Sequence, residues 1–544
     1  MWEHNYQPVG GSLGLSAIVA AIPLLVLFYM LGVKRKPSWL AATSALGTAF
    51  VVALLGFRMP AQLAITSVAY GVAFGLFPIA WIVFTSILLY RLTVDTGKFE
   101  IIKDSVAGLT NDRRLQALFI AFSFGAFVEG AAGFGAPVAV AAAMLTGLGF
   151  SPFYAAGICL LANTAPVAFG SIGIPVITLA GITGLPVLSL SAMVGRICAM
   201  VSVIIPTYLV VVMAGIAGAI EVLPAIVACG VTFAGAQFVV SNFVGPELTD
   251  ILGALLSLAA MVVVMKVWHP KKIFRLEGDV PVAATPKRHS GREIFMAWTP
   301  YLLLVVFVLA WGYPPFKAQL DQFTVPLNVA GLHNAIQRVP PVTKAVSSYA
   351  AVFTFNWLSA SGTSCLLAGM TAALLLGVSP KRYAGIYKAT AKQLAFPIMT
   401  IASMLGVAYL MNYSGMTSTL GLAFAATGSA FPFFSAILGW LGVFLTGSDT
   451  SANALFGNLQ VVTARALSIN PVLTASVNSA GGVMGKMISL SSIAVAVAAT
   501  GMKPSDEGKL FRFTLRHSIL LATVIGIIAM GFAYLAPGLI PLAP

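Results

Sequence analysis

Charged residues are scarce in this chain of 544 residues. Only 8% of the residues are Asp, Glu, Lys or Arg, whereas 59% are hydrophobic. A soluble domain carries roughly a quarter charged residues, so the composition excludes a soluble enzyme. Apolar runs of about 20 residues, each long enough to cross a hydrocarbon core as a helix, recur along nearly the whole chain. We predict an all-α polytopic membrane protein with about 12 to 14 transmembrane passages, some of them broken.

Cysteine and histidine are also rare, and neither forms a motif. The four cysteines are far apart in apolar surroundings and show neither metal-ligand nor disulfide spacing, so we interpret them as small packing residues. The five histidines are expected in loops or at helix ends, which argues against a histidine proton relay. A carboxylate is the expected proton carrier, and no metal site is predicted. These residues are Cys159, Cys198, Cys229, Cys365, His4, His269, His289, His333 and His517.

Nucleotide-binding loops are absent as well, although two segments resemble them superficially. Gly481 to Met487 has a spacer one residue too short for a phosphate loop, and Met487 replaces the metal-binding hydroxyl. Gly130 to Gly135 reverses the order of the dinucleotide fingerprint and does not follow a strand. Neither segment supports ATP or NAD as a cofactor. An ion gradient is therefore the expected source of energy.

Basic residues are abundant relative to acidic ones and give a net charge of +14. Five short segments hold 23 of the 30 lysines and arginines, as the positive-inside rule expects of cytoplasmic loops. We predict these loops at 34–36, 91–114, 266–292, 381–392 and 503–516. The N-terminus and the C-terminal Pro544 are then both outside. Because membrane topology accounts for the positive charge, no nucleic-acid partner is predicted.

Three short sequence patterns recur in the same order at nearly one separation. Trp39-Leu-Ala-Ala is repeated near Trp357 after 318 positions, and the Gly125 to Gly130 pattern is repeated from Gly442 after 317. Asn163-Thr-Ala is repeated at Asn478 after 315 positions. The loop charges give the two copies opposite orientations. Inverted repeats of this kind are typical of secondary transporters, whose substrate site lies between the repeats near the midplane.

Four clusters of Gly, Pro and polar residues interrupt the apolar segments. Irregular backbone at membrane depth is tolerated only where it is buried in protein or lines an aqueous cavity. We interpret the clusters as two pairs, each a re-entrant hairpin followed by a broken helix. The clusters cover residues 127–137 and 163–175 in the first half, and 446–453 and 478–486 in the second half.

A broken helix exposes N–H groups at the start of its second half, and these groups favour an anion. The clusters therefore predict a site for a small carboxylate without a dedicated arginine. The alternative is that small residues and hydroxyls only allow close helix packing. The predicted substrate-binding residues are Gly130, Gly133, Gly135, Asn163, Thr164, Gly447, Ser448, Thr450, Ser451, Asn453, Asn478 and Ser479.

Ionisable residues within the predicted breaks are candidates for function, because charge is costly in the bilayer. Burial disfavours the charged form of a carboxyl group, so Glu129 or Asp449 can carry a proton, and Glu129 is preferred. Asp449 can instead pair with Lys486 or cap a half-helix, and Glu129 can instead be a permanently paired structural charge. Glu247 and Asp250 are interpreted as part of a turn at the membrane edge.

Four long motifs together resemble the bacterial L-lactate permease family along nearly the whole chain. They are Phe124-Gly-Ala-Phe-Val-Glu-Gly-Ala-Ala-Gly-Phe-Gly-Ala-Pro-Val138, Asn163-Thr-Ala-Pro-Val-Ala-Phe-Gly170, Trp440-Leu-Gly-Val-Phe-Leu-Thr-Gly-Ser-Asp-Thr-Ser-Ala-Asn453 and Leu510-Phe-Arg-Phe513. The resemblance implies import of L-lactate, and often D-lactate and glycolate, by proton symport across the inner membrane. It also implies inverted repeats and an elevator-like movement of a transport domain.

The predicted organisation has five parts. Residues 1–36 form an N-terminal span, 37–265 the first inverted repeat, and 266–349 a cytoplasmic loop, a connecting span and an external loop. Residues 350–502 form the second repeat and 503–544 a C-terminal span. The lipid bilayer, a small monocarboxylate and protons are the expected partners, and a homodimer is left open. Alternatives are a transporter of another anion or one coupled to sodium, a membrane-embedded enzyme, and a passive channel.

Overall fold

The computed structural model describes residues 1–133, 135–276, 287 and 289–542. Within these residues, 12 helical segments are long and apolar enough to cross a membrane, and one bent pair brings the number to 13. Helices satisfy their backbone hydrogen bonds internally, as a chain in lipid must. The prediction of an all-α polytopic membrane protein with 12 to 14 passages is confirmed.

The helices of the first half lead from the N-terminal span to the end of the predicted first repeat. A π-helical segment, Ala117–Phe124, joins α6 to α7 without a break. The helices are α1 (Leu13–Phe28), α2 (Ser38–Val51), α3 (Ala61–Phe74), α4 (Trp81–Asp95), α5 (Lys98–Ala107), α6 (Arg113–Gln116), α7 (Gly125–Ala131), α8 (Ala136–Gly147), α9 (Pro152–Ala162), α10 (Gly170–Thr183), α11 (Val187–Glu221), α12 (Leu223–Phe243) and α13 (Thr249–Val267).

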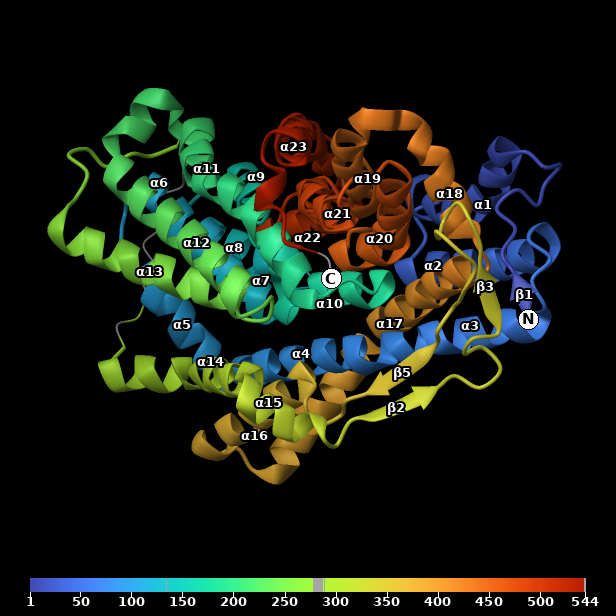
Figure 1. Ribbon diagram of the computed structural model, residues 1–544. Coiled ribbons are helices and arrows are strands. Elements are labelled where there is room, and N and C mark those ends of the chain that lie inside the picture. Colours follow the sequence, from blue (N-terminus) through green and yellow to red (C-terminus); the bar gives the residue numbers. More distant parts are fainter. Residues whose placement is uncertain (134, 277–286, 288, 543–544) are drawn as a thin grey trace.

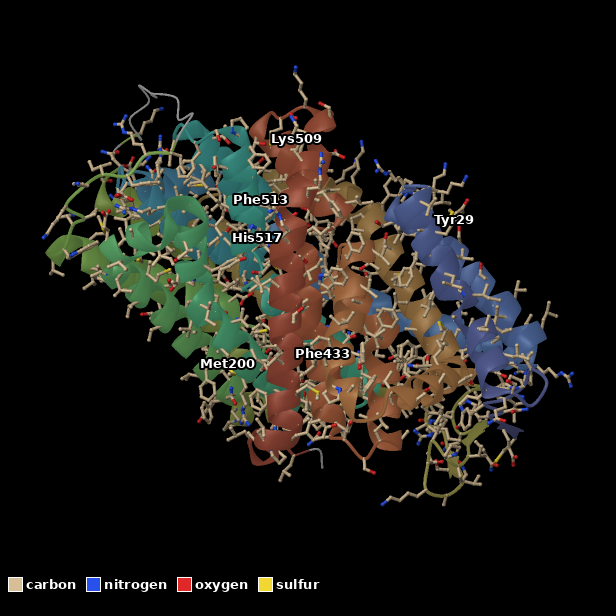
Figure 2. The ribbon with its side chains drawn as sticks, turned by 90° about the horizontal axis from the view of Figure 1, so that it is seen from above. Tyr29, Met200, Phe433, Lys509, Phe513 and His517 are labelled. Carbon is tan, nitrogen blue, oxygen red and sulfur yellow. The ribbon has the colours of Figure 1, made fainter. Side chains whose placement is uncertain are left out.

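The second half continues with ten helices in the described residues. They are α14 (Gly291–Gly312), α15 (Pro314–Asp321), α16 (Ser361–Leu375), α17 (Pro380–Tyr413), α18 (Met416–Phe424), α19 (Phe431–Thr446), α20 (Asp449–Ala466), α21 (Pro471–Lys486), α22 (Leu490–Thr500) and α23 (Glu507–Met530). In Figure 1, α11, α12 and α13 pack side by side, α17 packs against α2 and α3, and α19 to α22 lie between these groups. Lys509 of α23 and Tyr29 at the end of α1 lie at the same end of the molecule (Figure 2).

The first predicted hairpin runs from α6 through α7 and returns along α8. Its turn contains Gly133 and Gly135, with φ values of 60° and 83° that favour glycine. At its open end the Arg113 guanidinium donates to the Leu148 carbonyl over 2.7 Å. The chain then enters α9 and α10, which are bent by 63° at their junction. The predicted re-entrant hairpin and broken helix are both present in this half.

The second hairpin consists of α19 and α20, which meet at Gly447 with a φ of 72°. The prediction of a break within residues 478–486 is wrong, because α21 runs without interruption through Lys486. The break directly follows Lys486, at 487–489, and α22 begins after it at Leu490. The glycines of α21 serve close packing instead: a Cβ on Gly481 would lie 2.3 Å from the Ala436 carbonyl oxygen of α19.

Two small sheets, which were not predicted, form from the segment between α15 and α16, and one of them includes the N-terminal strand. In the first sheet β3 (Ile336–Arg338) pairs parallel with β1 (Trp2–Glu3) and antiparallel with β4 (Ser347–Ser348). In the second, β2 (Val325–Asn328) pairs antiparallel with β5 (Val352–Phe355). The N-terminal strand and the loop at 329–350 therefore lie on the same side of the molecule (Figure 1).

Parts of the predicted topology fall on residues that the structure does not describe. These parts are positions 277–286 and 288 of the predicted cytoplasmic loop at 266–292, Phe134 in the first hairpin turn, and the C-terminal Pro544. The described residues on either side of the loop belong to α13 and α14.

Candidate functional site

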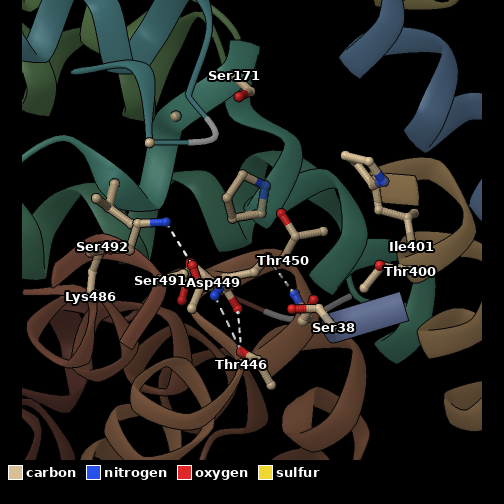
Figure 3. Close-up of a pocket in the computed structure, with 18 of the residues that line it drawn as sticks. Ser38, Ser171, Thr400, Ile401, Thr446, Asp449, Thr450, Lys486, Ser491 and Ser492 are labelled. Carbon is tan, nitrogen blue, oxygen red and sulfur yellow. Dashed lines mark hydrogen bonds between the residues drawn. The ribbon is translucent and has the colours of Figure 1, made fainter. Parts of the chain in front are cut away.

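A cavity of 320 Å³ lies where the turns of the two hairpins meet. Both turns contribute to its wall, although they are more than 300 positions apart in the sequence (Figure 3). Eight residues predicted from sequence line it: Glu129, Gly135, Gly447, Ser448, Asp449, Thr450, Ser451 and Lys486. The geometry therefore brings the two predicted carboxylates and the predicted charge partner to one place.

Four helix starts contribute residues to this wall. Gly135 precedes α8, Asp449 begins α20, and Ser491 lies in the first turn of α22. The regular part of α10 begins after three left-handed residues, Ser171 to Gly173, so that Ile174 and Pro175 reach the cavity. The first N–H groups of a helix have no partner within it and carry partial positive charge. Together the four starts create an environment for a small anion.

Glu129 of α7 reaches the cavity although only 4% of its surface is exposed. Its Oε2 accepts a hydrogen bond from the Asn163 amide over 3.1 Å. Two glycines leave space for the carboxyl group: a Cβ on Gly170 would lie 2.5 Å from Oε1, and one on Gly133 would lie 3.4 Å from it. The break between α9 and α10 thus supplies both the hydrogen-bond donor and the space for this carboxyl group.

Asp449 is the first residue of α20, and its carboxylate is held on one side only. Oδ2 accepts from the Ser479 hydroxyl over 2.5 Å and from the Asn453 amide over 3.3 Å. Oδ1 is buried without a hydrogen-bond partner among the described residues. Gly482 leaves space for it, since a Cβ there would lie 2.4 Å from Oδ1.

Lys486 ends α21 and provides positive charge at the cavity wall. Its ammonium donates to the Gly447 carbonyl over 2.7 Å, which ties α21 to the turn of the second hairpin. The lysine charge acts on both Glu129 and Asp449. The alternative prediction of an Asp449 and Lys486 ion pair is not realised as a direct contact, because Asp449 binds Ser479 and Asn453 instead.

Seven of the predicted substrate-binding residues lie behind the cavity wall. Asn163 binds Glu129, and Ser479 binds Asp449. Asn453 and Asn478 bind each other over 2.9 Å. Thr164 donates to the Leu161 carbonyl one turn earlier. The remaining two, Gly130 and Gly133, provide space for Asp250 and Ser171 respectively.

Several wall residues were not predicted. Ser38 and Trp39 come from α2, Thr400 and Ile401 from α17, and Ser491 and Ser492 from α22. The available signals were Pro397 within α17 and the serine cluster at 489–492, which begins three residues after Lys486. Proline in a transmembrane helix and serine near its start both mark places where backbone groups are free.

The structure refines one interpretation from sequence and contradicts another. Asp250 follows the turn between α12 and α13, but only 1% of it is exposed and it packs against Gly130. His517 lies in the middle of α23 and not at its end, and its ring hydrogen-bonds the Tyr208 hydroxyl over 2.5 Å. Sequence spacing alone did not show which neighbouring helices cover these positions.

A polytopic helical fold, with charged and hydroxyl side chains in a cavity between two hairpins, defines the chain as a membrane transporter. The chain belongs to the L-lactate permease family, whose sequence model matches residues 16–536. It is 47% identical to the L-lactate permease of Bacillus subtilis (strain 168) over 97% of each chain. It is 44% identical to the L-lactate permease of Escherichia coli (strain K12), covering 99% of this chain and 100% of that one. The glycolate permease GlcA of Escherichia coli (strain K12) is also 44% identical over 99% of each chain. The family resemblance predicted from the motifs is confirmed.

Proposed function

We propose that the chain imports L-lactate, and also D-lactate and glycolate, together with protons across the bacterial inner membrane. The names of its relatives support lactate and glycolate as substrates. The observation that carries the proposal is the convergence of four helix starts on one cavity. A volume of 320 Å³ is at the small end of ligand pockets, which span about 300 to 1,000 Å³. It suits a small anion.

The substrate carboxylate binds at the starts of α20 and α22 in this proposal. Peptide N–H groups there attract the anion, and the charge of Lys486 adds to this attraction. Hydroxyl groups on the same wall, at Ser448, Thr450, Ser451 and Ser491, orient the substrate hydroxyl group. Asn163, Asn453, Asn478 and Ser479 act from behind the wall by holding Glu129 and Asp449.

Protons enter the cycle at Glu129, with Asp449 as the second candidate. An added substrate anion increases the negative charge of a cavity that already holds two carboxyl groups and one lysine. Protonation of Glu129 removes one negative charge from this group, so substrate and proton bind more favourably together than alone. Asp449 has more hydrogen-bond donors and is better suited to remain ionised as an anchor.

The cavity in this conformation opens toward the cytoplasm in our proposal. It extends to the exposed residues Ser38 and Phe396, and Ser38 directly follows the basic segment Lys34 to Lys36. On the other side, α17 continues to Tyr409 and Tyr413. Their rings pack with Tyr70 and Tyr349 at centroid distances from 4.3 to 6.2 Å. This aromatic cluster closes the external path until an elevator-like movement of the two hairpins exposes the cavity there.

We also propose a topology for the chain. The N-terminus and the C-terminus lie outside in this topology, and the inverted repeats span 37–265 and 350–502. The first hairpin has its open end near the basic segment 91–114, whereas α19 and α20 are followed by a basic segment only after α22, at 503–516. This difference supports opposite orientations. A homodimer is proposed as the assembly.

Uptake of labelled lactate by purified protein in proteoliposomes tests the function. An inward proton gradient is expected to drive accumulation, and a sodium gradient alone is not. Glu129→Gln is expected to abolish uphill uptake while counterflow exchange continues, because exchange requires no net proton movement. Glu100→Gln on the exposed surface of α5 is the matched control and is expected to behave as the wild type. Sodium-driven accumulation, or unchanged uphill uptake by Glu129→Gln, would contradict the proposal.

A further inference from the structure

Asp250, in the first turn of α13, is a buried carboxyl group outside the cavity wall. Only 1% of its surface is exposed. Neither carboxyl oxygen has a hydrogen-bond partner among the described residues. The neighbouring Thr249 hydroxyl donates to the Gly245 carbonyl over 2.9 Å instead of to the carboxyl group. Such isolation is unusual, because buried polar side chains are normally hydrogen-bonded.

Isolation of this kind selects the protonated form of Asp250 in this conformation. Burying an ionised carboxylate without a partner is far more costly than burying a neutral carboxyl group. Even the neutral group loses its hydrogen bonds with water and gains none in return. An apolar residue of similar size would pack at this position without that loss. The acid is therefore better explained by a role in another step of the transport cycle than by packing.

The helix that packs on Asp250 is the one that carries Glu129. A Cβ on Gly130 would lie 2.8 Å from the Asp250 Cβ and 3.1 Å from the Ile251 nitrogen, so α7 and α13 approach closely beside Glu129. The Glu129 charge acts on Asp250. Two neighbouring acids in different surroundings hold a proton unequally. Glu129 has the Asn163 amide and the Lys486 charge, whereas Asp250 has neither, so the proton resides on Asp250 in this conformation.

The other groups around Asp250 leave Glu129 as its natural exchange partner. Helix α13 packs against α7, α10, α12 and the π-helical segment Ala117–Phe124. None of these four contains a Lys or Arg, and Glu129 is their only acidic residue. The remaining titratable neighbours are the thiols of Cys198 and Cys229 and the side chain of Glu247. Glu247 accepts a hydrogen bond from Ser361 over 3.1 Å and so has a partner of its own.

We propose that Asp250 is a second proton-carrying residue of this transporter and exchanges its proton with Glu129 across the contact between α7 and α13. In the transfer an O–H bond breaks at an Asp250 oxygen and an O–H bond forms at a Glu129 oxygen. The negative charge moves in the opposite direction, and no other bond changes. Asp250 thus stores the proton while Glu129 is ionised. The inference rests on the proton coupling proposed above.

Asp250→Asn and Glu247→Gln, compared in proteoliposomes with labelled lactate, test the storage role. A pH gradient of one unit is worth about tenfold accumulation for each coupled proton. Asp250→Asn is expected to keep counterflow exchange but to lose accumulation by about this factor. Glu247→Gln, in the same turn, is expected to accumulate lactate as the wild type does. Full accumulation by Asp250→Asn would show that the acid is a permanently neutral packing residue and would overturn the inference.

Infrared difference spectroscopy of the reconstituted protein gives a readout that is independent of transport. The wild type at neutral pH is expected to show a protonated-carboxyl band that Asp250→Asn lacks and that Asp250→Glu shifts. The inference would be overturned if the band persisted in Asp250→Asn and did not shift in Asp250→Glu. If Asp250→Asn folds poorly, Asp250→Glu alone decides, because it keeps a carboxyl group at this position. Failure of the wild type to accumulate lactate with protons would instead overturn the proposed function. If the wild type and Asp250→Asn accumulated lactate equally, only the inference about Asp250 would be overturned.

Discussion

The two halves of the transporter use glycine for opposite purposes. In the first half Gly173 belongs to three consecutive left-handed residues that interrupt the helix between α9 and α10. In the second half Gly481 and Gly485 remain within the regular helix α21 and allow α19 to approach closely. Proline distinguishes the two cases: Pro166 and Pro175 flank the first break, whereas no proline occurs between 472 and 503. In these two matching segments, the glycines that lie beside proline interrupt the helix and the glycines without proline do not.

The carboxyl groups of the two halves differ in how many hydrogen-bond donors they have. Glu129 has a single hydrogen-bond donor from a neighbouring residue, Asn163, whereas Asp449 has two donors. Glu129 therefore has fewer hydrogen-bond donors than Asp449, although Asp449 Oδ1 has no partner among the described residues. We expect Glu129 to change its protonation state during transport and Asp449 to keep the cavity in shape.

The largest effect on lactate uptake is expected at Lys486, whose charge acts on the carboxyl groups of both halves. Lys486→Met removes the positive charge that acts on both Glu129 and Asp449, as well as the hydrogen bond to Gly447. Lactate uptake is expected to fall by about a hundredfold, as for loss of a charged hydrogen-bonding group worth about 3 kcal/mol. Initial uptake rates in proteoliposomes measure this effect. Lys503→Met, at an exposed loop position, serves as the control, and equal rates for both variants would contradict the shared role.

Alanine substitution of the two space-providing glycines compares the halves directly. A methyl group at Gly170 meets Glu129, and one at Gly482 meets Asp449. Overpacking costs about 1 to 3 kcal/mol, so we expect each variant to lose roughly tenfold in uptake. Proton-driven accumulation is expected to be more affected in Gly170→Ala than in Gly482→Ala. Gly147→Ala, where an added Cβ meets nothing within 4 Å, controls for the substitution itself.

Gly481→Ala tests the packing role of the second half. The added Cβ would lie 2.3 Å from a backbone oxygen of α19, which cannot move as a side chain can. We expect a loss of about 1 to 3 kcal/mol in stability, with a smaller effect on substrate affinity than that of Gly482→Ala. Thermal unfolding of the detergent-solubilised protein and lactate binding measure the two quantities. A large loss of affinity at unchanged stability would mean that this part of α21 acts on the substrate.

The smallest effect on transport is expected at the N-terminal strand, which contributes no residue to the cavity wall. Burial lowers the pKa of His4 to about 4 from 6.5. The packed state thus binds fewer protons than the detached state between these values, and its stability is lost as the pH falls from 6.5 toward 4. At pH 5 the loss is about 2 kcal/mol. Hydrogen exchange of residues 2–6 at pH 7 and pH 5 measures it, and His4→Phe is expected to remove the difference.

Much of this architecture could be predicted from the sequence because hydropathy, loop charge and internal repeats are properties of the chain itself. The two hairpin turns at Gly135 and Gly447 were predicted in this way, and they line the cavity. The continuity of α21 could not be predicted, because it depends on the backbone of α19 across the contact. The burial of Asp250 could not be predicted for the same reason, because it depends on α7, which is more than 100 positions away in the sequence.

The four helix starts at the cavity have one further consequence. Peptide N–H groups do not titrate, so their attraction for a carboxylate is the same in acidic and in neutral surroundings. Any change of lactate transport with acidity then arises from side chains or from the substrate and not from this part of the site. An anion receptor built partly from the backbone thus lets acidic side chains respond to protons, while the share of the attraction that comes from the peptide N–H groups stays constant.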